Sequence, residues 1–192
     1  MLSLLQRRRQ MMLQRAAGPT PVVWSYSDGL PGDNGFVLST NGTRSETLKS
    51  TCVELTASGS SSHTTYELSG NYTQAEASFD AIANNAQVLL VLYTGSRWFC
   101  VRFQYSNNYK GLYLVNASAI ASMTKLATVA LNTSYTIKLV ISGATGSVYL
   151  NGSLLQSNID LSTIVASGNT RARFGCSGSV ATKIELYTMK FS

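Results

Sequence analysis

Apolar and polar side chains alternate in short runs from residue 22 to the end of the sequence, and clusters of Gly, Asn and Ser separate these runs. In residues 75–81, for example, three Ala and one Phe alternate with Glu76, Ser78 and Asp80. A period of two is typical of a strand with one face on the core and the other in water. The pattern predicts about twelve strands, over residues 22–26, 36–38, 52–56, 64–68, 75–81, 88–93, 97–105, 135–141, 147–150, 153–155, 171–176 and 183–191.

Two segments indicate how the strands connect. Residues 88–93 are apolar on both faces, as in a central strand, and a short turn joins them to residues 97–105 in a hairpin. The Asn151-Gly152 pair is the clearest turn signal, because a two-residue type I′ turn needs positive φ at both central positions. So many strands are too many for a small immunoglobulin domain and suit two large packed sheets. The sequence therefore predicts an all-β fold, a two-sheet antiparallel jelly-roll sandwich.

The beginning of the sequence has a different character. Residues 1–16 contain no Gly or Pro and are rich in Leu, Met, Gln and Arg, which are good helix formers, and the prolines at 19 and 21 end any helix. We therefore divide the chain into a basic, helix-prone arm (1–18) and a sandwich (19–192). The arm is interpreted either as a floppy tail or as a docking segment that orders on a partner. The side chains expected to dock are Leu4, Leu5, Arg7, Arg8, Arg9, Met11, Met12 and Arg15.

The net charge of +6 is unevenly distributed, because four arginines lie in the arm and the rest of the chain is nearly neutral. A nucleic-acid-binding domain would spread its Lys and Arg over a folded face, so we expect no specific nucleic acid partner and assign any anionic partner to the arm. No stretch reaches the about 18 apolar residues of a membrane span. The Arg7–Arg9 run follows the first apolar residues, the reverse of a secretory signal, which leaves a mitochondrial transit peptide as the alternative for a targeting role.

Three cysteines, Cys52, Cys100 and Cys176, are odd in number, widely spaced and set in apolar runs. This arrangement suits buried, reduced thiols better than a disulfide framework or a CxxC metal site.

Two segments carry a resemblance to known families. Residues 134–155, with an alternating strand, a Gly-containing turn, a second strand and the Asn-Gly turn, resemble the laminin-G and concanavalin A-like superfamily, and residues 173–191 are similar to its closing strands. This resemblance covers about residues 22–192 and implies a lectin-like sandwich. Residues 4–12 are similar to the Arg- and Met-rich leader of virion-associated proteins of tailed phages and prophages of gut bacteria, in which the leader precedes a lectin-like domain.

The two resemblances together imply a structural or decoration protein of a phage virion, in the capsid or the tail, assembled in the cytoplasm of the host bacterium. The arm would bind other virion proteins, and the sandwich would serve adhesion or stabilisation, with host-surface or mucosal glycans and further copies of the chain as open partners. The alternatives are a free carbohydrate-binding lectin and a hydrolase on the lectin fold.

The sequence offers little apparatus for catalysis. Glycoside hydrolases on this fold carry three carboxylates on one strand, whereas Glu76 and Asp80 share a strand face without a third. His63 is the single histidine, so one chain cannot build a His-dependent triad or a multi-His zinc site. We therefore expect that the chain is not an enzyme and has no cofactor.

A sugar site needs aromatic surfaces and polar side chains at one sheet or loop edge. The densest such cluster holds the candidate carbohydrate-binding residues Trp98, Tyr105, Asn107, Asn108, Tyr109 and Tyr113, for which a core position of Trp98 is the alternative. We expect no metal site, although Asp28 and Asp33, together with Asn34, are candidates for binding Ca²⁺ in a long turn; ordinary turn residues are the other interpretation.

Overall fold

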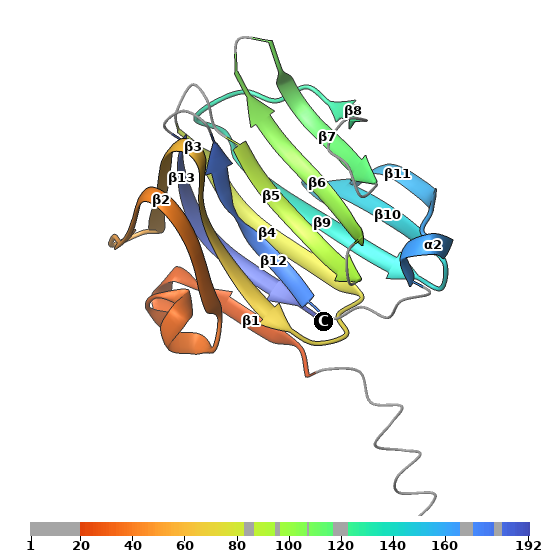
Figure 1. Cartoon of the computed structure of the whole chain (residues 1–192), viewed down its shortest axis with the longest axis horizontal. Helices are drawn as coiled ribbons and strands as arrows, with labels where there is room; N and C mark the ends of the chain where they lie inside the picture. Colours follow the sequence, from red (N-terminus) through yellow and green to blue (C-terminus); the bar gives the residue numbers. More distant parts are fainter. Residues whose placement is uncertain are drawn as a thin grey trace, which may run out of the picture.

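The chain folds almost entirely into strands that form two packed layers (Figure 1). The computed structural model describes residues 20–82, 87–94, 97–106, 108–116, 123–165, 171–178 and 182–192. Its elements are β1 (Val22–Ser25), η1 (Tyr26–Asp28), η2 (Pro31–Asn34), β2 (Val37–Leu48), β3 (Val53–Ser69), β4 (Gln74–Ala81), β5 (Gln87–Thr94), β6 (Arg97–Tyr105), β7 (Lys110–Asn116), β8 (Met123–Ala127), β9 (Ser134–Ser142), β10 (Thr145–Leu150), β11 (Ser153–Asp160), α2 (Ser162–Val165), β12 (Arg171–Gly178) and β13 (Thr182–Phe191).

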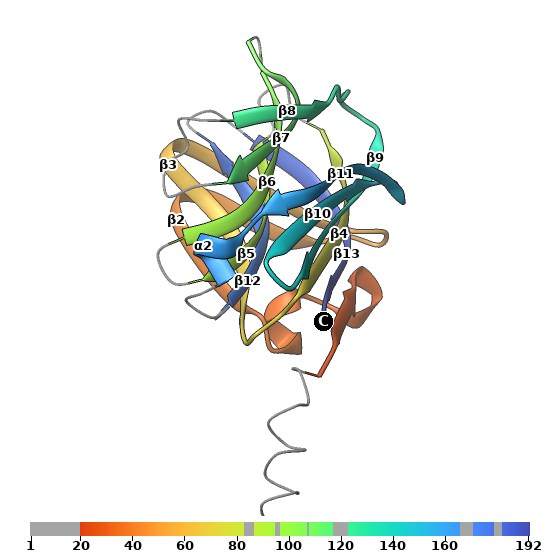
Figure 2. The ribbon, with the colours of Figure 1, turned by 90° about the vertical axis from the view of Figure 1, so that its right-hand side faces the viewer.

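The long strand β3 connects the two layers. Its first residues, Val53–Ala57, pair with β13, and its later residues, 62–69, pair with β12. The hydrogen-bonded order is therefore β11-β10-β9-β4-β13-β3 in one sheet and β3-β12-β5-β6-β7-β8 in the other, with β1 on β13 and β2 on β3. We call these the β4 sheet and the β6 sheet. Figure 2 shows the two layers from the side.

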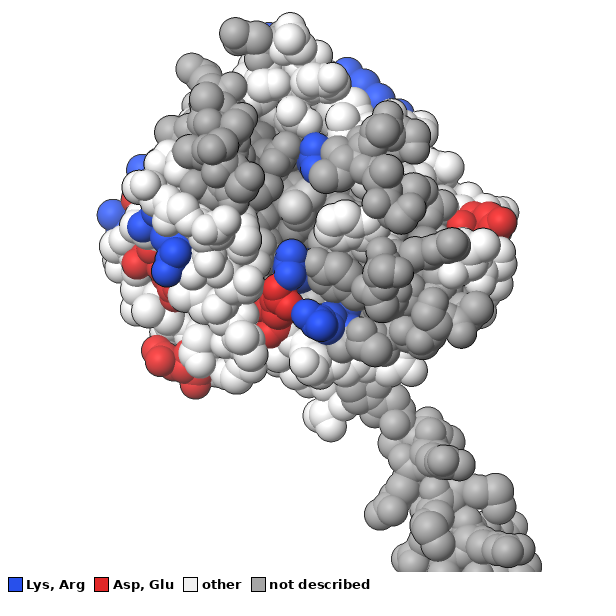
Figure 3. Space-filling model, viewed as in Figure 1, with Lys and Arg blue, Asp and Glu red and all other residues white. Residues whose placement is uncertain are grey.

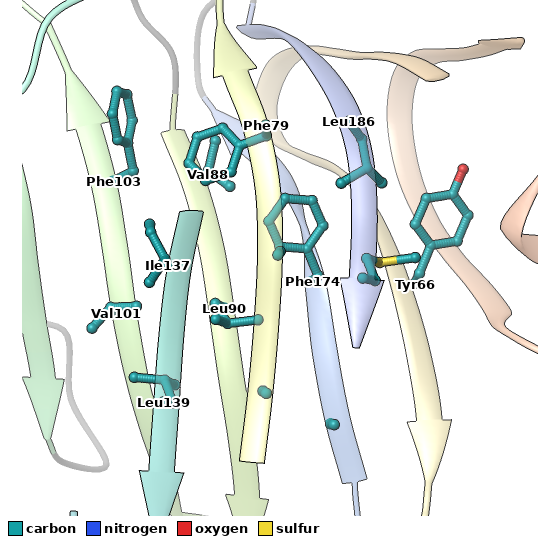
Figure 4. Packing of buried hydrophobic residues seen from close by; sticks show 14 of the residues in the cluster. Tyr66, Phe79, Val88, Leu90, Val101, Phe103, Ile137, Leu139, Phe174 and Leu186 are labelled. Carbon is teal, nitrogen blue, oxygen red and sulfur yellow. The ribbon is translucent and has the colours of Figure 1, made fainter. Parts of the chain in front are cut away.

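The core lies between the two sheets. In β4 every second residue is buried, as the alternation predicts, and Phe79 is the largest of these residues. The Phe79 ring contacts Phe103 of β6 at 5.5 Å and Phe174 of β12 at 5.7 Å between centroids, so side chains of the two sheets interdigitate. Figure 4 shows these rings with Leu90 and Ile137 beside them. Aromatic contacts of this kind stabilise a core beyond the area they bury.

The predicted fold class is confirmed, with differences at the edges of the sheets. Residues 52–56 and 64–68, expected as two strands, belong to the single strand β3. The expected strand 36–38 is the start of β2, which continues to Leu48 although none of its residues is buried. Pairing with β3, rather than burial, makes that segment a strand, and no alternation of apolar residues signals it. Strands β7 and β8 were also absent from the prediction.

Two local predictions are confirmed. Asn151 and Gly152 have φ angles of 50° and 79°, and they connect β10 to β11 at the pair Leu150 and Ser153. The three cysteines are free and buried. No helix in the described part of the chain is long and apolar enough to cross a membrane. The predicted arm lies outside the described residues, so its helix and its docking role stay predictions.

Candidate functional site

Strand β6 presents two chemically different faces. Phe99, Val101 and Phe103 point into the core between the sheets. The alternate residues therefore lie on the outer face of the β6 sheet, and they combine apolar, charged and amide side chains. These residues are Trp98, Cys100, Arg102 and Gln104.

The strand register places residues from six strands in rows across this outer face. The first row contains Thr65, Gly175, Leu89, Arg102, Tyr113 and Lys125, and the second contains Glu67, Arg173, Val91, Cys100, Val115 and Met123. Gly175 leaves the first row without a side chain between Thr65 and Leu89. A Cβ at Gly175 would collide with the backbone of β3, so glycine is required for the close approach of β12 and β3.

An apolar cluster forms the floor of part of this face. Val91, Cys100 and Val115 are at most 3% exposed although they point away from the main core. Leu89, Trp98 and Met123 pack against these three residues. The cluster therefore supplies a dry surface next to the charged residues of the face.

The charges on this face are predominantly positive. Arg173 donates a hydrogen bond to Glu67, and Nη1 of Arg171 lies 3.6 Å from the same carboxylate. The described side chains that point outward from the β6 sheet include four cations and one acid, Glu67. The cations are Arg102, Lys125, Arg171 and Arg173. Figure 3 shows basic surface in several places on this face, with an acidic patch between two of them.

Arg102 is the most buried of these cations, with 8% of its surface exposed. Its Nη1 donates to the Met123 sulfur at 3.8 Å, and its Nε has no hydrogen-bond partner among the described residues. Burial lowers the pKa of this guanidinium, and the Cys100 thiol opposes that shift. Gln104, two residues along the same strand face, has a buried Oε1 that likewise lacks a partner in the described part of the chain.

All nine acidic side chains of the sequence lie in the described part, and none forms an ion pair with Arg102. Four of them, Glu54, Glu76, Asp80 and Glu185, point outward from the β4 sheet on the opposite side of the sandwich. Glu76 and Asp80 therefore share a strand face, as the sequence predicts, but that face belongs to the other sheet. There the Tyr187 hydroxyl donates to Glu185 at 3.3 Å.

The structure divides the candidate carbohydrate-binding residues. Trp98 and Tyr113 lie on the outer face of the β6 sheet, and the exposed Tyr109 contacts Tyr113 edge to face. Tyr105 instead packs against the main core, with Nζ of Lys110 5.4 Å from its ring centroid. Asn108 is exposed in the turn between β6 and β7, and Asn107 lies outside the described residues. Whether these residues bind a sugar stays a prediction.

Sequence reasoning did not select Arg102, Gln104, Arg173 or Glu67. The alternation in residues 97–105 places Arg102 and Gln104 on the same face as Trp98, and this pattern could have identified them as site residues. Arg173 and Glu67 lie 106 positions apart in the sequence, so no local pattern predicts their pairing.

The two aspartates considered for a cation have local roles in the turn. An oxygen of Asp28, Oδ2, accepts a hydrogen bond from the Ser25 amide at 2.9 Å, and Asn34 Nδ2 donates to the Asp28 carbonyl. Asp33 lies in the first turn of η2. Within the described residues, no group of three or more His, Cys, Asp or Glu side chains is arranged to hold a metal ion.

Solved structures with the same fold are numerous and distant in sequence. An apo Crh5 transglycosylase matches with a TM-score of 0.72 and 10% identity, over 91% of this chain and 85% of that chain. The alginate lyase Aly36B matches with a TM-score of 0.57 and 10% identity, over 91% and 97%. The carbohydrate-binding module CBM66 from Bacillus subtilis matches with a TM-score of 0.55 and 16% identity, over 82% and 96%. No protein-family model matches the sequence, and no curated protein matches it significantly.

These similarities show the fold, a jelly-roll sandwich, which two enzymes and a carbohydrate-binding module share. They correct the expectation that the chain is not an enzyme. Two of the three structures are enzymes that match over nine-tenths of this chain, so the missing three-carboxylate strand is no ground for excluding activity.

Proposed function

We propose that the outer face of the β6 sheet binds a glycan chain. The observation that carries this proposal is the combination of aromatic, amide and guanidinium side chains on one outward-facing sheet face. Trp98 and the exposed Tyr109, whose ring packs on that of Tyr113, offer flat apolar surfaces for sugar rings, and Gln104 and the arginines offer groups that bind hydroxyl or acidic oxygens. Sites for small polar ligands commonly combine a mainly apolar lining with a few directed polar groups.

The similar structures support this proposal, because their names refer to a transglycosylase, an alginate lyase and a carbohydrate-binding module. The proposal concerns recognition of the glycan, and cleavage of a bound glycan is a separate question for experiment.

Binding to a panel of neutral and acidic polysaccharides, measured by affinity electrophoresis and calorimetry, tests the proposal. Trp98→Ala should weaken binding at least about tenfold, which corresponds to about 1.4 kcal/mol. Tyr149→Ala is the matched control, because Tyr149 lies on β10 of the other sheet with Lys138 over its ring. Melting curves establish that each variant is folded, and assays for new chain ends show whether a bound glycan is also cleaved. Absence of binding to every glycan, or an equal loss in the control, would refute the proposal.

The virion role expected from the leader is more specific than glycan binding, and none of the comparisons with known proteins supports it. It depends on a basic arm that precedes a lectin-like sandwich, and the particle, the docking partner and the cellular location are all part of it. Changing Arg7, Arg8 and Arg9 together to Gln should reduce attachment to a parent particle and leave the melting temperature of the sandwich unchanged. Full attachment of the triple variant would contradict this role.

A further inference from the structure

Arg102 is a buried cation for which the chain supplies no anion. It is 8% exposed, its Nε lacks a hydrogen-bond partner among the described residues, and its Nη1 donates to a thioether sulfur, that of Met123. All nine acidic side chains are described, and each lies outside ion-pair distance of Arg102. A buried, unpaired charge destabilises the folded chain.

In the adjacent row of the same face, an acid on the next strand neutralises an arginine. There Arg173, which is more exposed than Arg102, pairs with Glu67, and Arg171 shares that carboxylate. The cross-strand neighbour of Arg173 is therefore an acid, whereas Arg102 has no acidic cross-strand neighbour. Directly opposite Arg102 are Leu89 on β5 and Tyr113 on β7, neither of which can neutralise it.

We propose that Arg102 binds an acidic group of the glycan, so that the face recognises an anionic polysaccharide. This inference rests on the proposed function and names its ligand class. The planar guanidinium presents paired N–H donors that match the oxygens of a carboxylate or a sulfate ester. Gln104, with its unpartnered buried Oε1, accepts a hydrogen bond from a neighbouring sugar hydroxyl.

The surroundings of Arg102 strengthen its attraction for an anion. Leu89 lies directly opposite it on β5 and Met123 contacts its Nη1, and an ionic hydrogen bond beside such apolar neighbours is stronger than in water. The Met123 side chain is flexible and can move aside when an oxygen replaces its sulfur at Nη1. The excess of Arg and Lys on this face raises the local concentration of a polyanion.

Matched pairs of probes test the inference with the full chain. Oligogalacturonate and its methyl ester differ in carboxylate charge and by one methyl group per esterified residue, and a sulfated galactan and its desulfated form differ only in sulfate. Calorimetry in 0.15 M NaCl should show the wild type binding one acidic probe at least 20-fold more tightly than its neutral form, and the preferred pair distinguishes carboxylate from sulfate. Arg102→Met should abolish this preference, retain neutral binding, and melt no lower than the wild type because an unpaired buried charge is removed.

The control Lys138→Met removes one charge from the outer face of the β4 sheet and should retain the full preference. Equal binding of the acidic and neutral forms by the wild type overturns the inference, and so does a failure to bind either acidic probe. If neutral glycans still bind in these cases, the proposed function remains supported. A preference that persists in Arg102→Met also overturns it, because another basic segment then binds the anion.

Discussion

The ring of Tyr109 packs edge to face on the ring of Tyr113, with centroids 6.0 Å apart and planes at 78°. Tyr109 is 42% exposed, whereas Tyr113 is 8% exposed and adjoins Arg102. Tyr109→Ala should therefore weaken glycan binding several-fold and leave the melting temperature nearly unchanged. Tyr113→Ala should lower both affinity and stability, the latter by about 3 kcal/mol, because it removes a buried ring. Calorimetry and urea unfolding separate these effects, and an equal loss of stability in both variants would contradict the assignment.

The Glu67 carboxylate should be important for stability because it neutralises two arginines. Glu67→Gln leaves Arg173 and Arg171 next to each other without an acid, so we expect a loss of about 1–3 kcal/mol in the free energy of unfolding. Glu76→Gln on β4 is the control and should change stability by less than about 0.5 kcal/mol, because Glu76 is partly exposed and forms no ion pair among the described residues. Urea unfolding measures both, and similar values would show that the Glu67 pairing contributes little.

Stability should decline in alkaline solution because burial opposes ionisation of the thiols in the folded chain. Burial raises the pKa of Cys100 and of Cys176 from an ordinary value near 9 to about 12. Above pH 9 the unfolded chain loses these protons while the folded chain retains them, so the stabilisation is complete below pH 9 and is lost as pH approaches 12. Each thiol should contribute a decline of about 1.4 kcal/mol per pH unit in that window. Denaturation of wild type and Cys176→Ala between pH 8 and 10.5 checks this, and parallel curves would contradict it.

Gly152 should be intolerant of a β-branched residue because of its backbone conformation. Its φ is 79° and a Cβ would meet no atom within 4 Å, so Gly152→Val introduces conformational strain without a collision. We expect a loss of about 1 kcal/mol or more. Gly32→Val is the matched control, because Gly32 has equally open surroundings and no positive φ. Thermal melting compares the two variants, and equal melting temperatures would show that the turn tolerates the change.

Local chemistry in the sequence determined much of the sandwich. The alternation in 75–81 identified the buried and outward faces of β4, and Asn151-Gly152 identified a turn, because each depends on residues a few positions apart. Strand length was harder to predict at the edges. The exposed residues of β2 form a strand through pairing with β3, and that pairing is set by the rest of the sheet.

The candidate site shows the same division. The sequence by itself placed Trp98, Arg102 and Gln104 on one strand face and supplied Tyr109 and Tyr113 nearby. The tertiary structure alone decided that this face points away from the core, that Glu67 neutralises Arg173, and that Arg102 is buried without an acid. Both faces of β6 contain bulky apolar residues, so the choice depends on which one the opposing sheet covers. Charge pairing depends on strand neighbours far apart along the chain, and sheet topology brings those neighbours together.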